Sequence, residues 1–181
     1  MEFETERLTL KLLTIKDLED LHEMNSCFEV SEFNTIGVPK DFSETKKLFQ
    51  SVIEEGMNPN PKKCLWAIRL KTDGEFVGDI GMSFSIPKYS SAEIHYGLHP
   101  RKWGNGYASE AVKKLLEYGF LSLGLHRIEA GVATGNAKSI KLLDALGFMQ
   151  EGIRRKILPI RGEWFDNYQY AMLEEDYKSL N

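Results

Sequence analysis

The chain has 181 residues, 42% of them hydrophobic and 28% charged, which suits one domain of ordinary size. Its 23 basic and 27 acidic side chains give a formal net charge of −4, so we expect no direct binding to nucleic acid or to anionic membranes. The two cysteines, Cys27 and Cys64, form no CxxC pair, which argues against a disulfide framework and a zinc site and favours a reducing cytoplasm. No apolar run approaches the roughly 20 residues of a membrane span, and the charged N-terminal stretch is not typical of a signal peptide.

The first third of the chain carries one strand pattern and two helix patterns. Apolar and polar residues alternate over 8–12, which predicts a strand. A capping box from Thr14 to Asp17 predicts that a helix follows. A second helix is predicted from a cap at Asp41 to Gly56, where a C-terminal glycine belongs.

The rest of the chain alternates strands with strongly amphipathic helices. The predicted order is strands over 64–70, 76–85 and 92–98, a helix over 109–121, a strand over 127–133, a helix over 137–146, and two strands within 148–173. This order predicts an α/β fold with a mixed sheet in a single domain, 1–181. If the strands 92–98 and 127–133 are parallel neighbours, a right-handed crossover through the helix 109–121 joins them.

A glycine-rich loop, residues 101–107, separates a predicted strand from a strong helix. Its two glycines allow close backbone approach to a ligand, and the helix that follows offers free N–H groups and a positive dipole end. These features predict an anion site, although a turn that needs glycine only for its shape explains them too. The loop is no P-loop, because no Gly-Lys-Ser/Thr follows, and Ser109 stands where a dinucleotide fingerprint needs its third glycine.

Three segments together resemble a known family. Residues 92–98, followed by Trp103-Gly104-Asn105-Gly106-Tyr107-Ala108-Ser109-Glu110-Ala111, are similar to the acetyl-CoA-binding segment of GCN5-related N-acetyltransferases. Residues 136–139 and 147–152 are similar to the second half of the family signature. Residues 5–10 resemble the opening strand of the branch that acetylates the N-terminal alanine of ribosomal proteins.

The resemblance implies a GNAT-like, mostly antiparallel sheet flanked by helices, with a splayed central strand pair. It implies acetyl-CoA as cosubstrate, no metal, and cofactor binding by Leu98, Arg101, Trp103, Gly104, Asn105, Gly106, Tyr107, Ala108, Asn136 and Ser139. In this picture the loop amides bind the pyrophosphate, and the Leu98 amide polarises the thioester carbonyl. Asn136 would bind the pantetheine amides, although an Asn there also suits a helix cap, and both roles are compatible.

The candidate catalytic residues are Glu93 and Ser139. Glu93 would take a proton from the attacking amine through water, and His95, on the same strand face, has the more convenient pKa for that task. Leu143 stands where the family frequently has a general-acid tyrosine, which leaves Ser139 or a water to serve the departing thiolate. Surface positions for Glu93 and Ser139 without any catalytic role are the competing interpretation.

The resemblance implies direct attack of a primary amine on acetyl-CoA in a ternary complex. The acceptor is either a protein N-terminus, such as that of a ribosomal protein, or a small-molecule amine. A CoA-binding module that has lost catalysis, and a phosphate-binding domain unrelated to CoA, are the alternatives. The sequence leaves the oligomeric state open between monomer and homodimer.

Overall fold

The computed structural model describes residues 1–180. Its helices and strands are β1 (Glu2–Glu4), β2 (Leu8–Leu12), α1 (Leu18–Ser26), α2 (Phe28–Ser31), α3 (Phe42–Gly56), β3 (Lys63–Leu70), β4 (Phe76–Phe84), β5 (Ser91–Leu98), α4 (Tyr107–Glu117), β6 (Arg127–Ala133), α5 (Ala137–Ala145), β7 (Met149–Ile160), β8 (Glu163–Leu173) and α6 (Glu174–Leu180). Short 3-10 turns precede α1, β5 and α4, and a π-helical turn, Tyr118–Ser122, extends α4. No helix within residues 1–180 combines the length and apolar character that crossing a bilayer requires.

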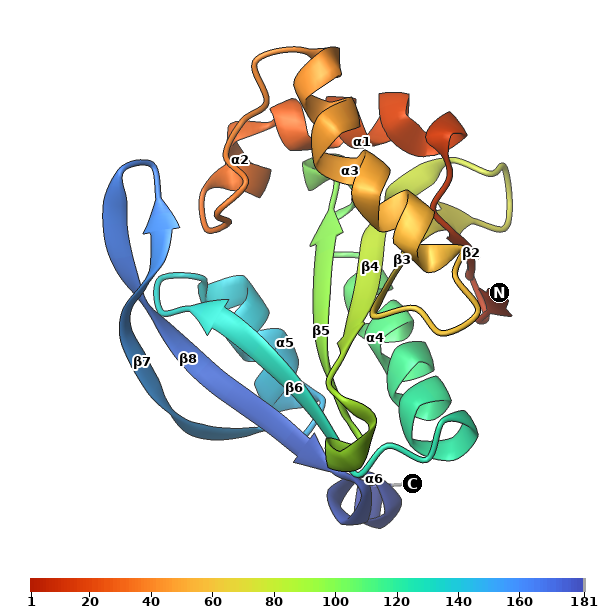
Figure 1. Cartoon of the computed structure of the whole chain (residues 1–181), viewed down its shortest axis with the longest axis vertical. Helices are drawn as coiled ribbons and strands as arrows, with labels where there is room; N and C mark the ends of the chain where they lie inside the picture. The colour runs from red at the N-terminus through yellow and green to blue at the C-terminus, as the bar shows by residue number, and fades with distance from the viewer. Residues whose placement is uncertain (181) are drawn as a thin grey trace.

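All eight strands form one mixed sheet in the order β1-β2-β3-β4-β5-β6-β8-β7. Every neighbouring pair is antiparallel except β5 and β6, which are parallel, so the condition set for a crossover through α4 is met. Residues 91–93 of β5 pair with 127–129 of β6, and the two strands then diverge, opening a wedge through the middle of the sheet (Figure 1). The predicted mixed sheet with a splayed central pair is therefore confirmed.

Local capping signals set the starts of the first helices. Thr14 and Asp17 form the predicted capping box, but it closes a 3-10 turn, and the α-helix begins only at Leu18. The Asp41 side chain accepts a hydrogen bond from the Glu44 N–H at 2.9 Å and caps α3 as predicted. The sequence analysis missed β1, α2 and α6, each of seven residues or fewer, because short elements carry little periodicity.

Helices cover both faces of the sheet, and each face has its own core. On one face, α4 and α5 pack Leu115 and Leu143 against Trp66, Ile80 and other sheet residues. On the opposite face, α1 and α3 pack side chains against β3 and β4, the buried set being Leu13, Leu18, Leu21, Met24, Phe49, Ile53, Leu65, Ala67 and Phe76. The wedge between β5 and β6 therefore opens between two helical layers (Figure 1).

One buried carboxyl gives the fold a pH-dependent stability. Asp79 on β4 is 8% exposed, and burial raises its pKa from the ordinary 3.8 to about 7. Between pH 4 and 7 the unfolded chain loses this proton while the folded chain keeps it, so stability falls as the pH rises. We expect Asp79→Asn to raise the free energy of unfolding by about 1–4 kcal/mol at pH 8 and by much less at pH 4. Urea unfolding at both pH values measures this, and an equal effect at both would contradict it.

Candidate active site

The N–H group of Leu98 points into the wedge. The next residue, His99, donates its N–H to the Val77 carbonyl at 2.9 Å, on the β4 side of β5. Because successive N–H groups of a strand point to opposite edges, the Leu98 N–H points away from β4, toward the open side of β5. Strand β6 pairs with β5 only as far as Glu93, so it leaves this N–H without a strand partner on the side of the wedge. A carbonyl oxygen placed there would receive a backbone hydrogen bond.

The glycine-rich loop ends at the start of α4, beside the end of β5. Gly104 and Gly106 both adopt φ +78°, a left-handed conformation that side chains disfavour, and Gly106 is the N-cap of α4. The first intrahelical bond runs from the Glu110 N–H to the Gly106 carbonyl, so the N–H groups of residues 107–109 have no partner within the helix. Three free N–H groups at a positive helix end suit a phosphate.

The N-terminal segment holds this loop in place. Glu110, in the first turn of α4, accepts hydrogen bonds from the Arg7 N–H at 2.8 Å and from Arg7 Nε at 2.7 Å, and a further one from the Thr5 hydroxyl. Arg7 Nη1 donates to the Asn105 carbonyl at 3.0 Å, and its guanidinium lies 4.7 Å from the centre of the Tyr107 ring. Burial raises the pKa of Glu110, but these hydrogen bonds outweigh it and hold the pKa below its ordinary value.

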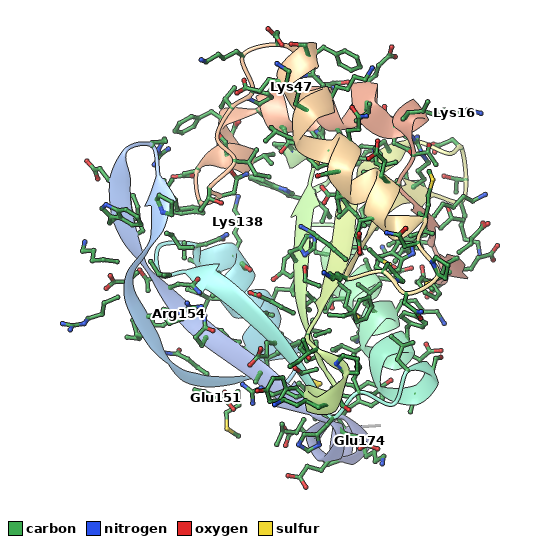
Figure 2. The ribbon with its side chains drawn as sticks, viewed as in Figure 1. Lys16, Lys47, Lys138, Glu151, Arg154 and Glu174 are labelled. Carbon is green, nitrogen blue, oxygen red and sulfur yellow. The ribbon has the colours of Figure 1, made fainter. Side chains whose placement is uncertain are left out.

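The loop side chains brace the backbone rather than pointing to a common ligand. The Trp103 indole donates to the Leu98 carbonyl at 2.8 Å, and Lys138 Nζ lies 3.7 Å from the centre of the Trp103 ring. Lys138 is on α5, so this contact joins the two sides of the wedge near its open end (Figure 2). The Asn105 side chain donates to the carbonyls of Lys102 and Trp103 at 3.2 and 3.1 Å.

Arg101 turns toward α1. Its guanidinium Nη1 lies 3.3 Å from Glu23 Oε1, and its side chain is 79% exposed. Its backbone N–H donates to His99 Nδ1 at 3.2 Å. The positive charge of Arg101 is thus paired on the α1 side of the loop.

Two predicted residues, Asn136 and Ser139, line the α5 side of the wedge. Asn136 Oδ1 accepts from the Ser139 N–H at 3.1 Å, which confirms that Asn136 caps α5. The Ser139 hydroxyl lies 2.6 Å from the Tyr96 hydroxyl, which reaches it from β5. Leu143 is 1% exposed and belongs to the core. The sequence analysis did not identify Tyr96 as a site residue, although its position two residues before Leu98 places both side chains on the same face of β5.

Glu93 lies at the point where the wedge begins, on the face covered by α1 and α3. A Cβ added at Gly131 would lie 3.2 Å from Glu93 Oε1 and 2.8 Å from Asn167 Nδ2, so both side chains converge over that glycine. Glu93 is exposed, and Asn167 is 6% exposed. This carboxylate therefore faces solvent beside the parting strands.

His95 shares the face of Glu93, as predicted, but its environment differs. Burial lowers the pKa of His95 from 6.5 to about 3, and its Nε2 is packed over Gly81 without a hydrogen-bond partner among the described residues. The expectation of a convenient pKa is wrong, because burial of the ring against Gly81 of β4 disfavours its charged form. His95 is neutral at physiological pH and too weak a base to deprotonate an amine.

A groove of about 490 Å³ lies on the same face, between α3 and the sheet. Its walls are mainly apolar, from Leu48, Phe49 and Val52 on α3, Leu65 on β3 and Ile36 in the preceding loop. Lys62 and Lys63 lie at the groove together with Glu55. The groove and Glu93 lie on one side of the sheet, and the glycine-rich loop lies at the end of β5.

Comparison with known proteins identifies the family to which this chain belongs. The model of the acetyltransferase (GNAT) domain matches residues 7–149, which include the wedge and the loop. The chain belongs to the GNAT acetyltransferase family. This GNAT domain is 36% identical over 173 residues to an uncharacterized N-acetyltransferase, p20, of Bacillus licheniformis, covering 96% of each chain.

The chain is also similar to a solved GNAT structure and to two further acetyltransferases whose names include a substrate class. A GNAT-family acetyltransferase structure from Bacillus anthracis superposes with a TM-score of 0.83 at 31% identity, covering 97% of this chain and 99% of the other. A putative ribosomal N-acetyltransferase of Bacillus subtilis, YdaF, is 26% identical over 96% of this chain and 94% of its own. A spermidine N(1)-acetyltransferase of Vibrio cholerae is 25% identical over 94% of this chain and 95% of its own.

The protein is thus an N-acetyltransferase, and membership of the family implies acetyl-CoA as its cosubstrate. Within residues 1–180, no group of three or more His, Cys, Asp or Glu side chains is placed to hold a metal ion. The free N–H groups at the start of α4 suit the pyrophosphate of this cosubstrate, and the Leu98 N–H, which has no strand partner on the side of the wedge, suits its thioester carbonyl.

Proposed function

We propose that the chain, acting as one domain over residues 1–181, transfers the acetyl group of acetyl-CoA to a primary amine by direct attack in a ternary complex. The observation that carries this proposal is the Leu98 N–H, which points into the wedge beside the loop. The amides of residues 103–108 bind the pyrophosphate, and Asn136 binds the pantetheine amides. The two free cysteines, Cys27 and Cys64, agree with a reducing cytoplasm as the place of reaction.

The residues of this chain act on both reactants. The Leu98 N–H donates to the carbonyl oxygen of the thioester and stabilises the negative charge that develops there. Glu93 accepts, through water, the proton that the amine must lose. Ser139 donates a hydrogen bond to the departing thiolate. Amine and cofactor meet at the wedge from opposite sides of the sheet.

The groove argues for an acceptor with an apolar body. Its apolar walls favour burial of a hydrophobic segment, while Lys62 and Lys63 disfavour a polycation. A protein N-terminus with apolar first residues fits this chemistry, and the likeness to YdaF supports it. A small amine with an apolar body fits the same groove.

A polyamine is the second candidate acceptor, supported by the likeness to the spermidine acetyltransferase of Vibrio cholerae. The rate of CoA release at saturating acetyl-CoA, measured with a panel of N-terminal peptides, apolar primary amines and spermidine, separates the candidates. We expect N-terminal peptides and apolar primary amines to have higher kcat/KM than spermidine, and Lys63→Glu to shift the preference toward spermidine. Highest kcat/KM with spermidine in the wild type would replace the first candidate with the second.

Absence of a tyrosine at Leu143 motivates the alternative of a CoA-binding module without turnover. The same assay decides it, because such a module binds CoA yet releases none from acetyl-CoA with any amine of the panel. Detectable acetylation of one amine, confirmed by mass spectrometry, would exclude this alternative.

The two roles proposed for Asn136 are separable by mutation. Ser is as good an N-cap as Asn, so Asn136→Ser is expected to preserve stability within a few tenths of a kcal/mol. It removes the amide that contacts pantetheine, so the Kd of acetyl-CoA should rise about three- to tenfold. Asn136→Ala is the control that loses the cap as well, at about 1 kcal/mol of stability. Calorimetry and urea unfolding measure the two effects, and unchanged affinity in Asn136→Ser would leave Asn136 as a cap alone.

A further inference from the structure

Two hydroxyl groups meet across the wedge. Tyr96 lies on β5, two residues before Leu98, and Ser139 lies in the first turn of α5, the helix drawn behind β6 in Figure 1. Their oxygens are 2.6 Å apart, which is a short hydrogen bond. Tyr96 is half-buried, and its side chain lies on the α4–α5 face of the sheet, as Leu98 does. The contact therefore joins β5 to α5 beside the wedge in which the thioester is proposed to lie.

Proton donation from Ser139 to the thiolate is easier if a stronger acid gives a proton to Ser139 in turn. A departing thiolate needs a proton, and a serine hydroxyl is a poor acid, whereas a phenol has an ordinary pKa near 10. Burial raises the pKa of Tyr96 above 10.0, and the hydrogen bond to Ser139 acts in the opposite direction by lowering it. Tyr96 thus keeps its proton at neutral pH. Leu143 is a core residue and cannot donate a proton. The phenol that contacts Ser139 is Tyr96.

We propose that Tyr96 and Ser139 form a proton relay to the leaving thiolate, in which Tyr96 is a positioning residue that acts through Ser139. As the carbon–sulfur bond breaks, its electron pair goes to sulfur, and sulfur takes the Ser139 hydroxyl proton. Ser139 Oγ takes the Tyr96 proton at the same time. The resulting phenolate recovers a proton from solvent, which receives the proton that the amine loses by way of Glu93. The products are the amide and CoA, and the relay rests on the proposed function.

Kinetics of two single variants and their double variant test the relay. Tyr96→Phe and Ser139→Ala are each expected to lower kcat about 100-fold, with the KM for acetyl-CoA changed by about twofold at most. The double variant should be no slower than the slower single variant, because both mutations break the same chain. Tyr118→Phe is the matched control, since it removes the hydroxyl of a half-buried tyrosine whose ring packs against Phe3 and Trp66. Losses that multiply in the double variant, or an unchanged kcat in Tyr96→Phe, would overturn the relay.

A binding measurement tests the relay without any acceptor amine. Calorimetry compares CoA with desulfo-CoA, which lacks the sulfur, at pH 7 and pH 9. A hydrogen-bonded thiolate should give wild-type protein a roughly tenfold gain in CoA affinity over desulfo-CoA at the higher pH, and Ser139→Ala should lose that gain. Tyr96→Phe should reduce it, whereas a merely structural role of Tyr96 would weaken both ligands equally.

The outcomes separate the relay from the proposed function. Failure of wild-type protein to bind CoA would refute the proposed cofactor site and the relay with it. Binding of both ligands without a gain that depends on sulfur would refute the relay alone. If no amine of the panel is acetylated, the proposed reaction fails, and the comparison of CoA with desulfo-CoA still decides whether the hydroxyl pair serves the thiolate.

Discussion

Replacing Gly106 with tryptophan is expected to abolish measurable binding of acetyl-CoA. Gly106 has φ +78° and caps α4, and its Cβ position lies 3.4 Å from Arg7 Nη2. An indole at this position blocks the space over the free N–H groups of residues 107–109, where a phosphate must approach. Since these amides supply the proposed pyrophosphate contacts, we expect a rise in Kd of at least about 100-fold, corresponding to two or three lost charge-assisted hydrogen bonds. Calorimetric titration with acetyl-CoA measures it.

The matched control is Gly124→Trp. Gly124 also has positive φ, at +62°, is exposed, and has no atom within 4 Å of its Cβ position. It follows the C-terminal end of α4, so the mutation introduces the same residue and similar backbone strain at the helix end away from the loop. We expect Gly124→Trp to bind acetyl-CoA like the wild type. Unchanged affinity in folded Gly106→Trp would mean that the loop is a turn and binds no cofactor.

Removing one backbone N–H should slow the reaction almost as severely. Replacing the Leu98 amide with an ester, by incorporating leucic acid, deletes the hydrogen-bond donor and leaves the side chain intact. Loss of one oxyanion donor costs about 10²–10³ in kcat, and we expect a decrease of this size with little change in the KM for acetyl-CoA. Steady-state kinetics with the best acceptor amine measure both constants.

An ester at Gly97 is the control for this experiment. By the same strand alternation, the Gly97 N–H points toward β4, where Gly97 pairs with Asp79. This ester is expected to lower stability by about 1 kcal/mol, the worth of a ladder hydrogen bond, and to leave kcat unchanged. Equal losses of kcat for the two esters would show that the Leu98 amide has no special part in catalysis.

Local signals predicted much of the fold correctly. The caps at Thr14 and Asp41 depend on hydrogen bonds within four residues, so the residue types and their spacing already contain the interaction. Alternation of apolar and polar residues predicted β2, and the apolar face of the helix between β5 and β6 predicted α4. The three-residue strand β1 depends instead on pairing with β2, which no local pattern encodes.

The part of the candidate site that the backbone of the glycine-rich loop forms was predictable from the sequence. Gly104 and Gly106 were recognisable because their positive φ requires glycine. The contact between Tyr96 and Ser139 joins residues 43 positions apart, and only the packing of α5 against β5 brings them together. The low pKa of His95 likewise depends on burial of its ring against Gly81 of the neighbouring strand, which the pattern of one strand does not reveal.

The tie between the N-terminal segment and α4 has an electrostatic consequence for the cofactor. Glu110 places a negative charge in the first turn of the very helix that is proposed to receive an anion, and Arg7 neutralises that charge at 2.7 Å. If residues before Leu8 were cleaved or displaced, the bare carboxylate would repel the incoming pyrophosphate across a short distance. A segment that touches no reacting atom thereby offsets a local repulsion at the entrance to the site.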